Sequence, residues 1–495
     1  MKSVLYVRLP CLKIYPGGLI AIADYVHKNK PEVKQRIIEL SLIPPHQRGA
    51  YLKEAIQQYR PDVIAFSWRN IQTFSPHDGT PAMEAVIKFD TSNKIMDKLS
   101  SVYFASLLIF DFVYQIYKNK SYIALAHKLS PGSKVVVGGT AFSCFPEQLI
   151  RELPPGTIGV VGEGETAMLK VIEGKSLEDE SVIYREEGKV VRHTGCTFFD
   201  LNACTPVDFS YIEEIFPEIR QFGGEQIGIQ TKRGCPYNCT FCLYNVIEGQ
   251  HVRYRRPEVV MQDLTTLVRR FGFKDYFFAD SQFISHVSAL PLVEELLDRI
   301  IAEKLGISWT GFLRIENIKQ PLAKKMLDSG ISSFDLSFTG SQKIIDRLQL
   351  HYTIEDQLDA FRAIKAAGFS NQMVKLYLPL NSPGETPETL LETADTCRRI
   401  YDIIGKDNVN IWLFFLAIQS GTKLEKSLIE EGYFHQDYNP LSYNPFAIKK
   451  LLYNPPPLGK MIGRSILEAK TLCRDESELG KWTVDVLERK LTTGR

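Results

Sequence analysis

Three cysteines close together in the middle of the chain constrain its fold more than any other feature. Cys235, Cys239 and Cys242 form a C-x₃-C-x₂-C run in a loop opened by residues 232–234. Eight residues are too few for orderly disulfides, because each bridge needs separated and well-aimed Cα atoms. Thiolates held this close can face one metal centre. Three of them leave one iron of a [4Fe–4S] cube open, and an open metal position is where a substrate or cofactor binds.

A zinc knuckle and a chance cluster are the alternatives for these cysteines. Zinc would need a fourth Cys or His in a second pair at knuckle spacing. The nearest histidine is His251, nine residues after Cys242, and no cysteine accompanies it. The sequence therefore favours an iron–sulfur site.

Six strand-then-helix units surround the cysteine run between residues 225 and 425. The strands are predicted at 226–231, 275–280, 307–312, 333–338, 372–378 and 408–415, and segments such as 257–271 show helical apolar spacing. Six such units predict a partial (β/α)₆ barrel, whose chemistry lies at the carboxyl ends of its strands. The cysteine loop follows the first of them.

With Phe241 as its aromatic residue, the run resembles the signature of radical S-adenosylmethionine (SAM) enzymes. The resemblance implies that the three cysteines bind a [4Fe–4S] cluster and that the open iron takes the amino and carboxylate groups of SAM. It also implies SAM contacts from Phe241 and from the strand ends. The candidates there are Asp280, Arg314, Ser337, Thr339, Gly340, Ser341, Lys375 and Gln419. Phe338 stands where the family usually has a glutamate, so SAM is expected in a shifted pose.

Residues 1–170 alternate short apolar strands with helices. Strands are predicted at 2–9, 36–39, 62–67, 133–140 and 157–161, and helices at 19–28, 51–59 and 82–129. This alternation predicts a Rossmann-like (flavodoxin-like) parallel sheet covered on both faces. Such sheets bind cofactors in the crevice beyond the carboxyl ends of their strands.

Glycine-rich loops at these strand ends resemble the cobalamin-binding domain of many radical SAM enzymes. The match includes a Pro-Gly-Gly-Leu turn, a Val-Gly-Gly strand end and a Gly-Glu-Gly-Glu-Thr run. Glycines let a large planar ligand approach the backbone. The expected cobalamin contacts are Gly17, Gly18, Ser67, Arg69, Asn70, Gly138, Gly139, Thr140, Gly162, Glu163, Gly164 and Glu165.

One departure concerns the lower face of cobalt. The D-x-H-x-x-G motif that supplies an axial histidine in other cobalamin proteins is absent; His46 has its spacing, but Pro44 replaces the aspartate. In the branch that methylates tryptophan, an arginine in the corresponding loop faces the cobalt. Arg69 is our candidate for that catalytic role, the alternative being a surface arginine after a strand.

Glu258 is a second catalytic candidate. In the tryptophan-methylating branch a carboxylate approaches the open iron, and SAM serves as a polar methyl donor without being cleaved to a radical. The competing interpretation is ordinary, because an acid after Pro257 complements the first turn of a helix.

Residues 171–224 are expected to form a linker with a β-hairpin around Glu186–Gly188, and residues 426–495 a helical C-terminal region. Two helices are predicted there, at 457–474 and 478–490. The Tyr- and Pro-rich stretch before them either caps the barrel mouth or is a packed loop.

Charge and cysteine usage limit the function classes. Lys+Arg 59 against Asp+Glu 58 implies no pull toward nucleic acid. Nine cysteines, an odd number, fit a reducing cytoplasm. The N-terminus does not read as a signal peptide, and the apolar stretch 103–117 is expected to fall short of a membrane span.

Together, the resemblances to radical SAM enzymes and to their cobalamin-binding domain imply a cobalamin-dependent radical SAM methyltransferase. It would act on an unreactive carbon or phosphorus of a small-molecule or peptide substrate, with a flavodoxin- or ferredoxin-type electron donor. Ring formation or rearrangement with the same cofactors is an alternative. A cobalamin sensor with the cluster as an electron relay is an alternative of another class.

Overall fold

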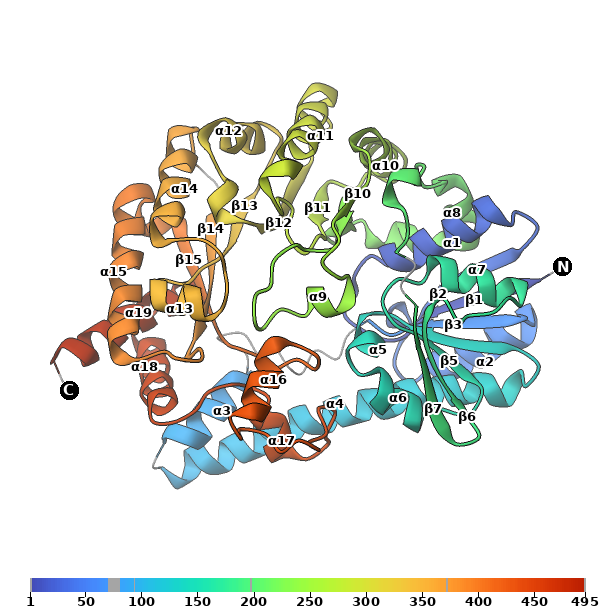
Figure 1. Ribbon diagram of the computed structural model, residues 1–495, viewed down its shortest axis with the longest axis horizontal. Helices are drawn as coiled ribbons and strands as arrows, with labels where there is room; N and C mark the ends of the chain where they lie inside the picture. Colours follow the sequence, from blue (N-terminus) through green and yellow to red (C-terminus); the bar gives the residue numbers. More distant parts are fainter. Residues whose placement is uncertain (1, 70–80, 93, 196–197, 371–372, 494–495) are drawn as a thin grey trace.

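Two mainly parallel sheets face one another across the molecule, and helices from the end of the chain join their lower edges (Figure 1). The computed structural model describes residues 2–69, 81–92, 94–195, 198–370 and 373–493. The predicted α/β fold, with a Rossmann-like domain followed by a partial barrel, is confirmed.

The N-terminal sheet has seven strands in the order β2-β1-β3-β4-β5-β6-β7. Its first five strands run parallel, and apart from the edge strand β2 they are mainly apolar because helices cover both faces. These strands are β1 (Ser3–Arg8), β2 (Lys34–Glu39), β3 (Val63–Ser67), β4 (Lys134–Gly138) and β5 (Thr157–Val160). Their helices are α1 (Gly17–Asn29), α2 (Arg48–Tyr59), α5 (Thr140–Cys144), α6 (Pro146–Glu152) and α7 (Glu165–Glu173).

The predicted hairpin extends this sheet. Strand β6 (Ser181–Glu186) pairs antiparallel with β5, and β7 (Lys189–Thr194) pairs antiparallel with β6. The sheet therefore reaches Thr194, so the hairpin is part of the N-terminal layer and not of a free connector.

A helical hairpin is inserted between β3 and β4. It consists of α3 (Pro81–Thr91) and α4 (Ile95–Leu129), and it packs against the C-terminal helix α18 (Leu458–Leu472). Gly463 makes this close approach possible, since an added Cβ would lie 2.8 Å from Thr91 Cγ2. The insertion links the first domain to the end of the chain.

Within the described residues, α4 is long and apolar enough to cross a membrane by length and composition alone. The long helical region predicted over residues 82–129 is present, but the expectation that its apolar stretch falls short of a membrane span considered only residues 103–117, whereas α4 has 35 residues. Phe112, Ile116 and Ile123 of this helix are buried, so one of its faces packs on the protein.

The second sheet has six parallel strands in the order β15-β14-β13-β12-β11-β8, as predicted for the partial barrel. They are β8 (Ile227–Ile229), β11 (Asp275–Phe278), β12 (Ser308–Leu313), β13 (Ser333–Ser337), β14 (Met373–Leu380) and β15 (Val409–Phe415). The accompanying helices are α10 (Pro257–Phe271), α11 (Leu290–Glu303), α12 (Gln320–Asp328), α13 (Gln342–Arg347), α14 (Ile354–Ala366), α15 (Pro387–Ile404) and α16 (Lys423–Glu430).

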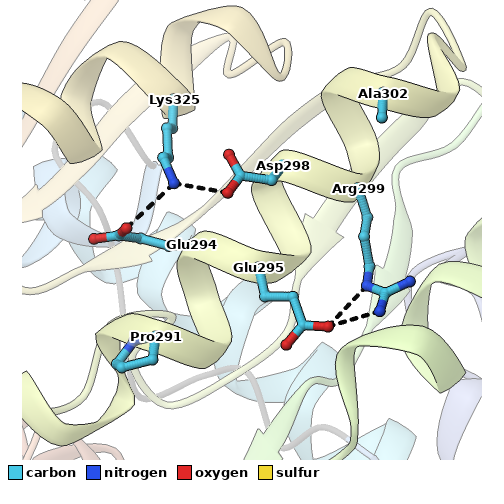
Figure 2. A pocket seen from close by; sticks show the side chains of 7 residues that line it. All are labelled: Pro291, Glu294, Glu295, Asp298, Arg299, Ala302 and Lys325. Carbon is cyan, nitrogen blue, oxygen red and sulfur yellow. Dashed lines mark hydrogen bonds and ion pairs between the residues drawn. The ribbon is translucent and has the colours of Figure 1, made fainter.

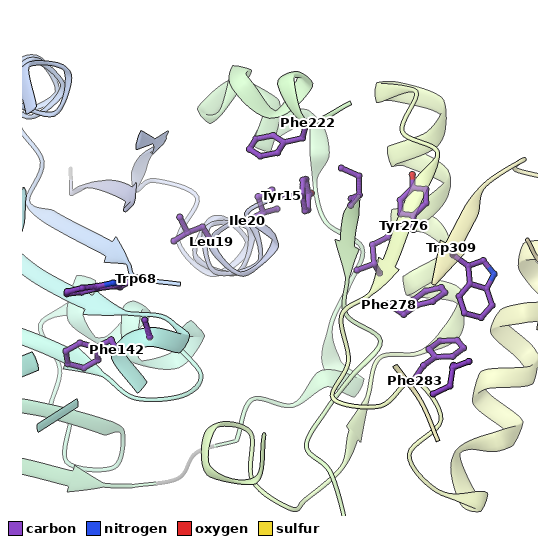
Figure 3. Close-up of a cluster of buried hydrophobic side chains, with 14 of the residues drawn as sticks. Tyr15, Leu19, Ile20, Trp68, Phe142, Phe222, Tyr276, Phe278, Phe283 and Trp309 are labelled. Atoms are coloured by element: carbon purple, nitrogen blue, oxygen red, sulfur yellow. The ribbon is translucent and has the colours of Figure 1, made fainter. Parts of the chain in front are cut away.

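The hydrophobic core is continuous from one sheet to the other (Figure 3). The linker contributes α8 (Phe209–Ile215) and a 3₁₀ segment, Pro217–Phe222. Phe222 is fully buried there, and its ring lies edge-on to Tyr15 with 6.2 Å between centroids. The linker therefore helps to hold the two layers together.

The tail forms α17 (Pro445–Lys450), α18 and α19 (Leu479–Thr493), which confirms the two long helices predicted there. Helix α19 packs on β15 and α15. Gly480 lies directly on the sheet, since an added Cβ would be 1.9 Å from Ile411 O. The tail thus completes the barrel wall.

Candidate active site between the two sheets

The cysteine loop is clamped at its base. Short strands β9 (Lys232–Arg233) and β10 (Arg253–Tyr254) pair antiparallel and bring its two ends together. The amide of Cys235 donates to Gly249 O at 3.1 Å. Gly234 has φ of +86°, and an added Cβ would lie 2.2 Å from His251 O. Only glycine fits this turn into the cysteines.

The three thiols are free and largely shielded from solvent. Burial raises the pKa of Cys239, and it raises the pKa of Cys242 to about 12. Their thiolates therefore need a bound cation to offset burial, which suits metal ligands. Within the described residues no three His, Cys, Asp or Glu side chains converge on a single ion. A cube does not require this, because each cysteine binds a different iron.

Buried polar groups at the first two strand ends support this loop. Asp280 is fully buried and accepts hydrogen bonds from Thr231 N, Thr231 Oγ1 and Lys232 N at 2.5–3.1 Å. Lys232, also fully buried, donates to Gly234 O at 2.9 Å and to Ser281 Oγ at 2.7 Å. Asp280 is thus engaged with protein groups, and its SAM contact stays a prediction.

Arg314 also contacts the cysteine loop. Its guanidinium stacks on the Tyr237 ring at 3.5 Å from the centroid, pairs with Glu316 and donates to Leu350 O at 2.6 Å. The side chain is 5% exposed. Arg314 therefore orients the loop through Tyr237, while its predicted contact with the SAM carboxylate remains untested.

The loop after β13, which was predicted to contact SAM, packs against the protein interior. Thr339 and Ser341 are buried, and Ser341 Oγ donates to Glu392. A Cβ on Gly340 would lie 2.5 Å from Thr393 Cα, so this glycine permits close packing on α15. Ser337, in contrast, is exposed at the strand end.

Three further predicted residues lie along the barrel strands or the cysteine loop. Lys375 Nζ is 3.7 Å from Asp335 Oδ1. Gln419 is half-buried after β15, and its backbone oxygen accepts from Thr422 Oγ1 at 2.7 Å. Phe241 is half-buried against the core, and the amide of the preceding Thr240 donates to Leu348 O at 3.0 Å.

Glu258 lies in the first turn of α10, as its competing interpretation expects. Its side chain is 39% exposed, and Oε1 is 3.3 Å from Arg256 Nη1. No contact of this carboxylate with the cysteine loop is present among the described residues. Its catalytic role stays a prediction that the geometry does not support.

A glycine loop at the carboxyl edge of the N-terminal sheet approaches the short helix that follows the cysteine loop. A Cβ on Gly162 would lie 3.2 Å from Ile247 O, in the short helix α9 (Tyr244–Ile247) that follows Cys242. A Cβ added to Gly17 would lie 3.5 Å from Gly228 O in β8. Helix α9 stands between the two sheets in Figure 1. The carboxyl ends of both sheets therefore meet at the cysteines.

Strand-end geometry explains the glycines beside this contact. Gly139 has φ of +97°, and its Cβ would lie 2.6 Å from Trp68 O. Gly138 and Thr140 flank it at the end of β4 and the start of α5, and Ser67 ends the neighbouring β3. Gly18 leaves open space where a side chain would be, and Gly164 lies against Ile22.

The two glutamates predicted to contact cobalamin form ion pairs with arginines of the central domain. Glu165 pairs with Arg233, and Glu163 pairs with Arg253 and Arg233; all four side chains are at most 14% exposed. Burial opposes ionisation of Glu163, but the hydrogen bonds from Arg253 and the charge of Arg233 hold its pKa below the usual value. These carboxylates tie the two domains together beside the cysteines.

Arg69 is half-buried at the same edge. Burial, followed by the nearby charge of Arg8, lowers its pKa, and the Tyr244 hydroxyl lies close enough to act on it electrostatically. Nη1 is buried and has no hydrogen-bond partner among the described residues. The cobalt-facing role of Arg69 stays a prediction. Asn70, its predicted neighbour, lies outside the described residues.

Two contributors to the site escaped the sequence analysis. Lys232 gave no signal because a lysine next to an arginine normally reads as solvated. Glu248 accepts a hydrogen bond from Gly234 N at 3.0 Å, and burial raises its pKa. Its position six residues after Cys242 was the available clue.

A surface hollow between α11 and α12 lies apart from this site (Figure 2). Its charged side chains pair among themselves: Lys325 with Glu294 and Asp298, and Arg299 with Glu295. Because each of these charges is already paired, the hollow offers no unpaired charge from these residues for binding a ligand.

Comparison with known proteins places the chain by sequence and by fold. Residues 229–397 match the Radical SAM superfamily model. The chain is 27% identical over 49% of its length to an uncharacterized methyltransferase of Pyrococcus horikoshii. That match covers 54% of the relative, and the chain spans about half the length of the curated relatives it matches first.

Two solved structures share the whole fold. The methyltransferase TsrM from Kitasatospora setae, solved with cobalamin and a [4Fe–4S] cluster, covers 100% of both chains with a TM-score of 0.67 and 16% identity. OxsB, a cobalamin-dependent SAM radical enzyme, covers 99% of this chain and 72% of its own, with a TM-score of 0.66 and 16% identity.

Proposed function

We propose that this protein is a cobalamin-dependent radical SAM methyltransferase, since residues 229–397 match the Radical SAM superfamily model. It transfers a methyl group from SAM, by way of cobalamin, to an unreactive carbon or phosphorus of a small-molecule or peptide substrate. The resemblance of half the chain to a protein named as a methyltransferase supports the reaction class.

One observation carries this proposal: the glycine loops of the N-terminal sheet abut the cysteine loop of the barrel. Gly162 approaches Ile247, and Arg233, two residues before Cys235, pairs with Glu165. A cofactor in the first crevice would therefore lie beside one bound to the cysteines. Such proximity is what transfer between two cofactors requires.

Cys235, Cys239 and Cys242 would hold the cluster, and the backbone around Gly138, Gly139 and Gly162 would receive the corrin. When bound, the cluster supplies an open iron for SAM, and cobalamin supplies the methyl carrier. Lys232 and Asp280 hold the loop ends through their hydrogen bonds. Arg314 fixes Tyr237 within the loop.

Arg69 is proposed to face the lower side of cobalamin. Its buried, unpartnered Nη1 presents a cation where other cobalamin proteins offer a histidine. A cation there disfavours a lower ligand. Arg69→Lys should change the cobalamin absorption spectrum and lower the methylation rate, whereas Arg151→Lys on the exposed face of α6 should do neither. An unchanged spectrum and rate would remove this role.

SAM contacts are proposed for Ser337, Lys375, Gln419 and the Phe241 backbone at the barrel mouth. The electron donor is proposed to be a flavodoxin or ferredoxin, since the cluster must be reduced before SAM can be cleaved. A cytoplasmic location is proposed from the free thiols, which need reducing conditions.

Metal content after anaerobic reconstitution tests the proposal. About four irons and one cobalt per chain are expected, and incubation with SAM should yield S-adenosylhomocysteine together with a methylated acceptor. Iron without cobalt would contradict the cobalamin assignment. Iron and cobalt without any SAM-derived product would favour the sensor instead.

A further inference from the structure

Helix α4 carries an exposed apolar stripe that neither cofactor site uses. Its members are 46–74% exposed and recur every three or four residues, as in the seam of a coiled coil. They are Met96, Leu99, Tyr103, Leu107, Phe110, Tyr114 and Tyr117. A patch of this kind on a folded protein marks an interaction surface.

The opposite face of α4 holds the helix in place. Phe112 and Ile116 are buried, and the helix packs against α2 and α3. In Figure 1 the helix runs along the lower edge of the molecule. The stripe is therefore presented outward on an anchored support.

The spacing of the stripe is nearly symmetric about its midpoint. If the helix direction is reversed about a point between Ser106 and Leu107, Met96 falls opposite Tyr117, Leu99 opposite Tyr114, and Tyr103 opposite Phe110. An antiparallel copy of the same helix would meet large apolar side chains at each of these levels. We propose that α4 pairs antiparallel with α4 of a second copy of this chain around a twofold axis near Leu107.

A lipid surface is a poorer partner for the same stripe. Between residues 94 and 120 the sequence has four cations, Lys94, Lys98, Lys118 and Lys120, against Asp97 and Asp111, and none of these cations lies between residues 99 and 117. Helices that lie on anionic membranes are rich in lysine and arginine on their polar face. The charge of α4 therefore favours a protein partner.

Sedimentation velocity of the full, reconstituted chain tests the proposal. The wild type is expected to be a dimer at micromolar concentration. Tyr103→Glu/Phe110→Glu should raise the dimer dissociation constant by at least about 100-fold. Val287→Glu, at another exposed apolar residue, should leave it unchanged. Iron per chain should be equal in all variants, which controls for folding.

A monomeric wild type, or a dimer insensitive to the stripe variants, would overturn the proposal. Stripe-dependent flotation with phosphatidylcholine–phosphatidylglycerol vesicles would assign the stripe to lipid and also overturn it.

Discussion

The two facing sheet edges present their chemistry differently. The N-terminal edge offers mainly backbone, shaped by Gly138, Gly139 and Gly162, with Arg69 beside it, whose Nη1 has no hydrogen-bond partner in the part of the chain that the structure describes. At the barrel edge, Asp280 and Arg314 are already bound to protein groups. A planar cofactor needs access to the first edge, whereas the second must hold a cysteine loop rigidly. The difference shows that strand-end polar residues can hold a loop in place through bonds to other protein groups.

The largest effect that would sharpen this comparison is expected at the cysteines. Cys239→Ser removes one of three thiolates on which the cluster depends, so iron per chain should fall close to zero and methylation should fall at least about 1000-fold. Metal analysis and product assays measure both. Cys473→Ser, in the tail, should keep full iron content. Retention of about four irons in Cys239→Ser would remove this cysteine from the ligand set.

Gly139→Ala should damage the N-terminal edge alone. The new Cβ would meet Trp68 O at 2.6 Å on a backbone with φ of +97°, so cobalt per chain should fall while iron is kept. Unfolding free energy should drop by about 3 kcal/mol. Gly188→Ala is the matched control, because its φ is +79° but nothing lies within 4 Å of the added Cβ. Equal cobalt in both variants would separate this loop from cobalamin.

Arg233→Met tests the ionic link between the edges. It leaves Glu165 buried without its partner, so unfolding free energy should fall by about 3 kcal/mol, and domain docking should weaken. Denaturant unfolding measures the first, and limited proteolysis of the linker measures the second. Arg269→Met breaks an exposed pair with Glu303 and should cost under about 1 kcal/mol. Similar losses in the two variants would contradict a buried interdomain link.

A further expected effect is a pH dependence at the barrel mouth. Burial raises the pKa of Glu385 to about 8, while the unfolded chain has the ordinary value near 4.5. Between these two values the native state keeps a proton on Glu385 that the unfolded chain has lost. The contribution of Glu385 to the free energy of unfolding is therefore fully present below pH 4.5 and is lost as pH rises through about 8. Glu385→Gln should flatten the decline in unfolding free energy between pH 5 and 8. Gln262→Glu or other surface changes should not alter this slope, and an equal slope in Glu385→Gln would contradict the assignment.

Much of the fold was predictable from local pattern. The six barrel strands, the parallel N-terminal sheet and the tail helices follow apolar periodicity and turn residues, which act over a few neighbours. The hairpin was also predictable, but its membership of the N-terminal sheet was not. Strand pairing between β5 and β6 depends on packing that adjacent residues do not encode.

The candidate site divides in the same way. The cysteines stand out because three thiols within eight residues have few physical interpretations. Glu163 and Glu165 were expected to contact the cofactor, yet they pair with arginines that follow them by 68 to 90 residues. Glu258 illustrates the converse: its proline neighbour correctly indicated an ordinary helix start.

The sequence by itself determined the order of the strands and helices, the two strand-end edges and the cysteine loop, because each depends on spacing along the chain. Only the tertiary structure decided which charges are available there. Whether Arg69 is unpartnered, or Arg314 engaged, depends on which distant groups fold against it, and burial makes those pairings decisive for every charge at the site.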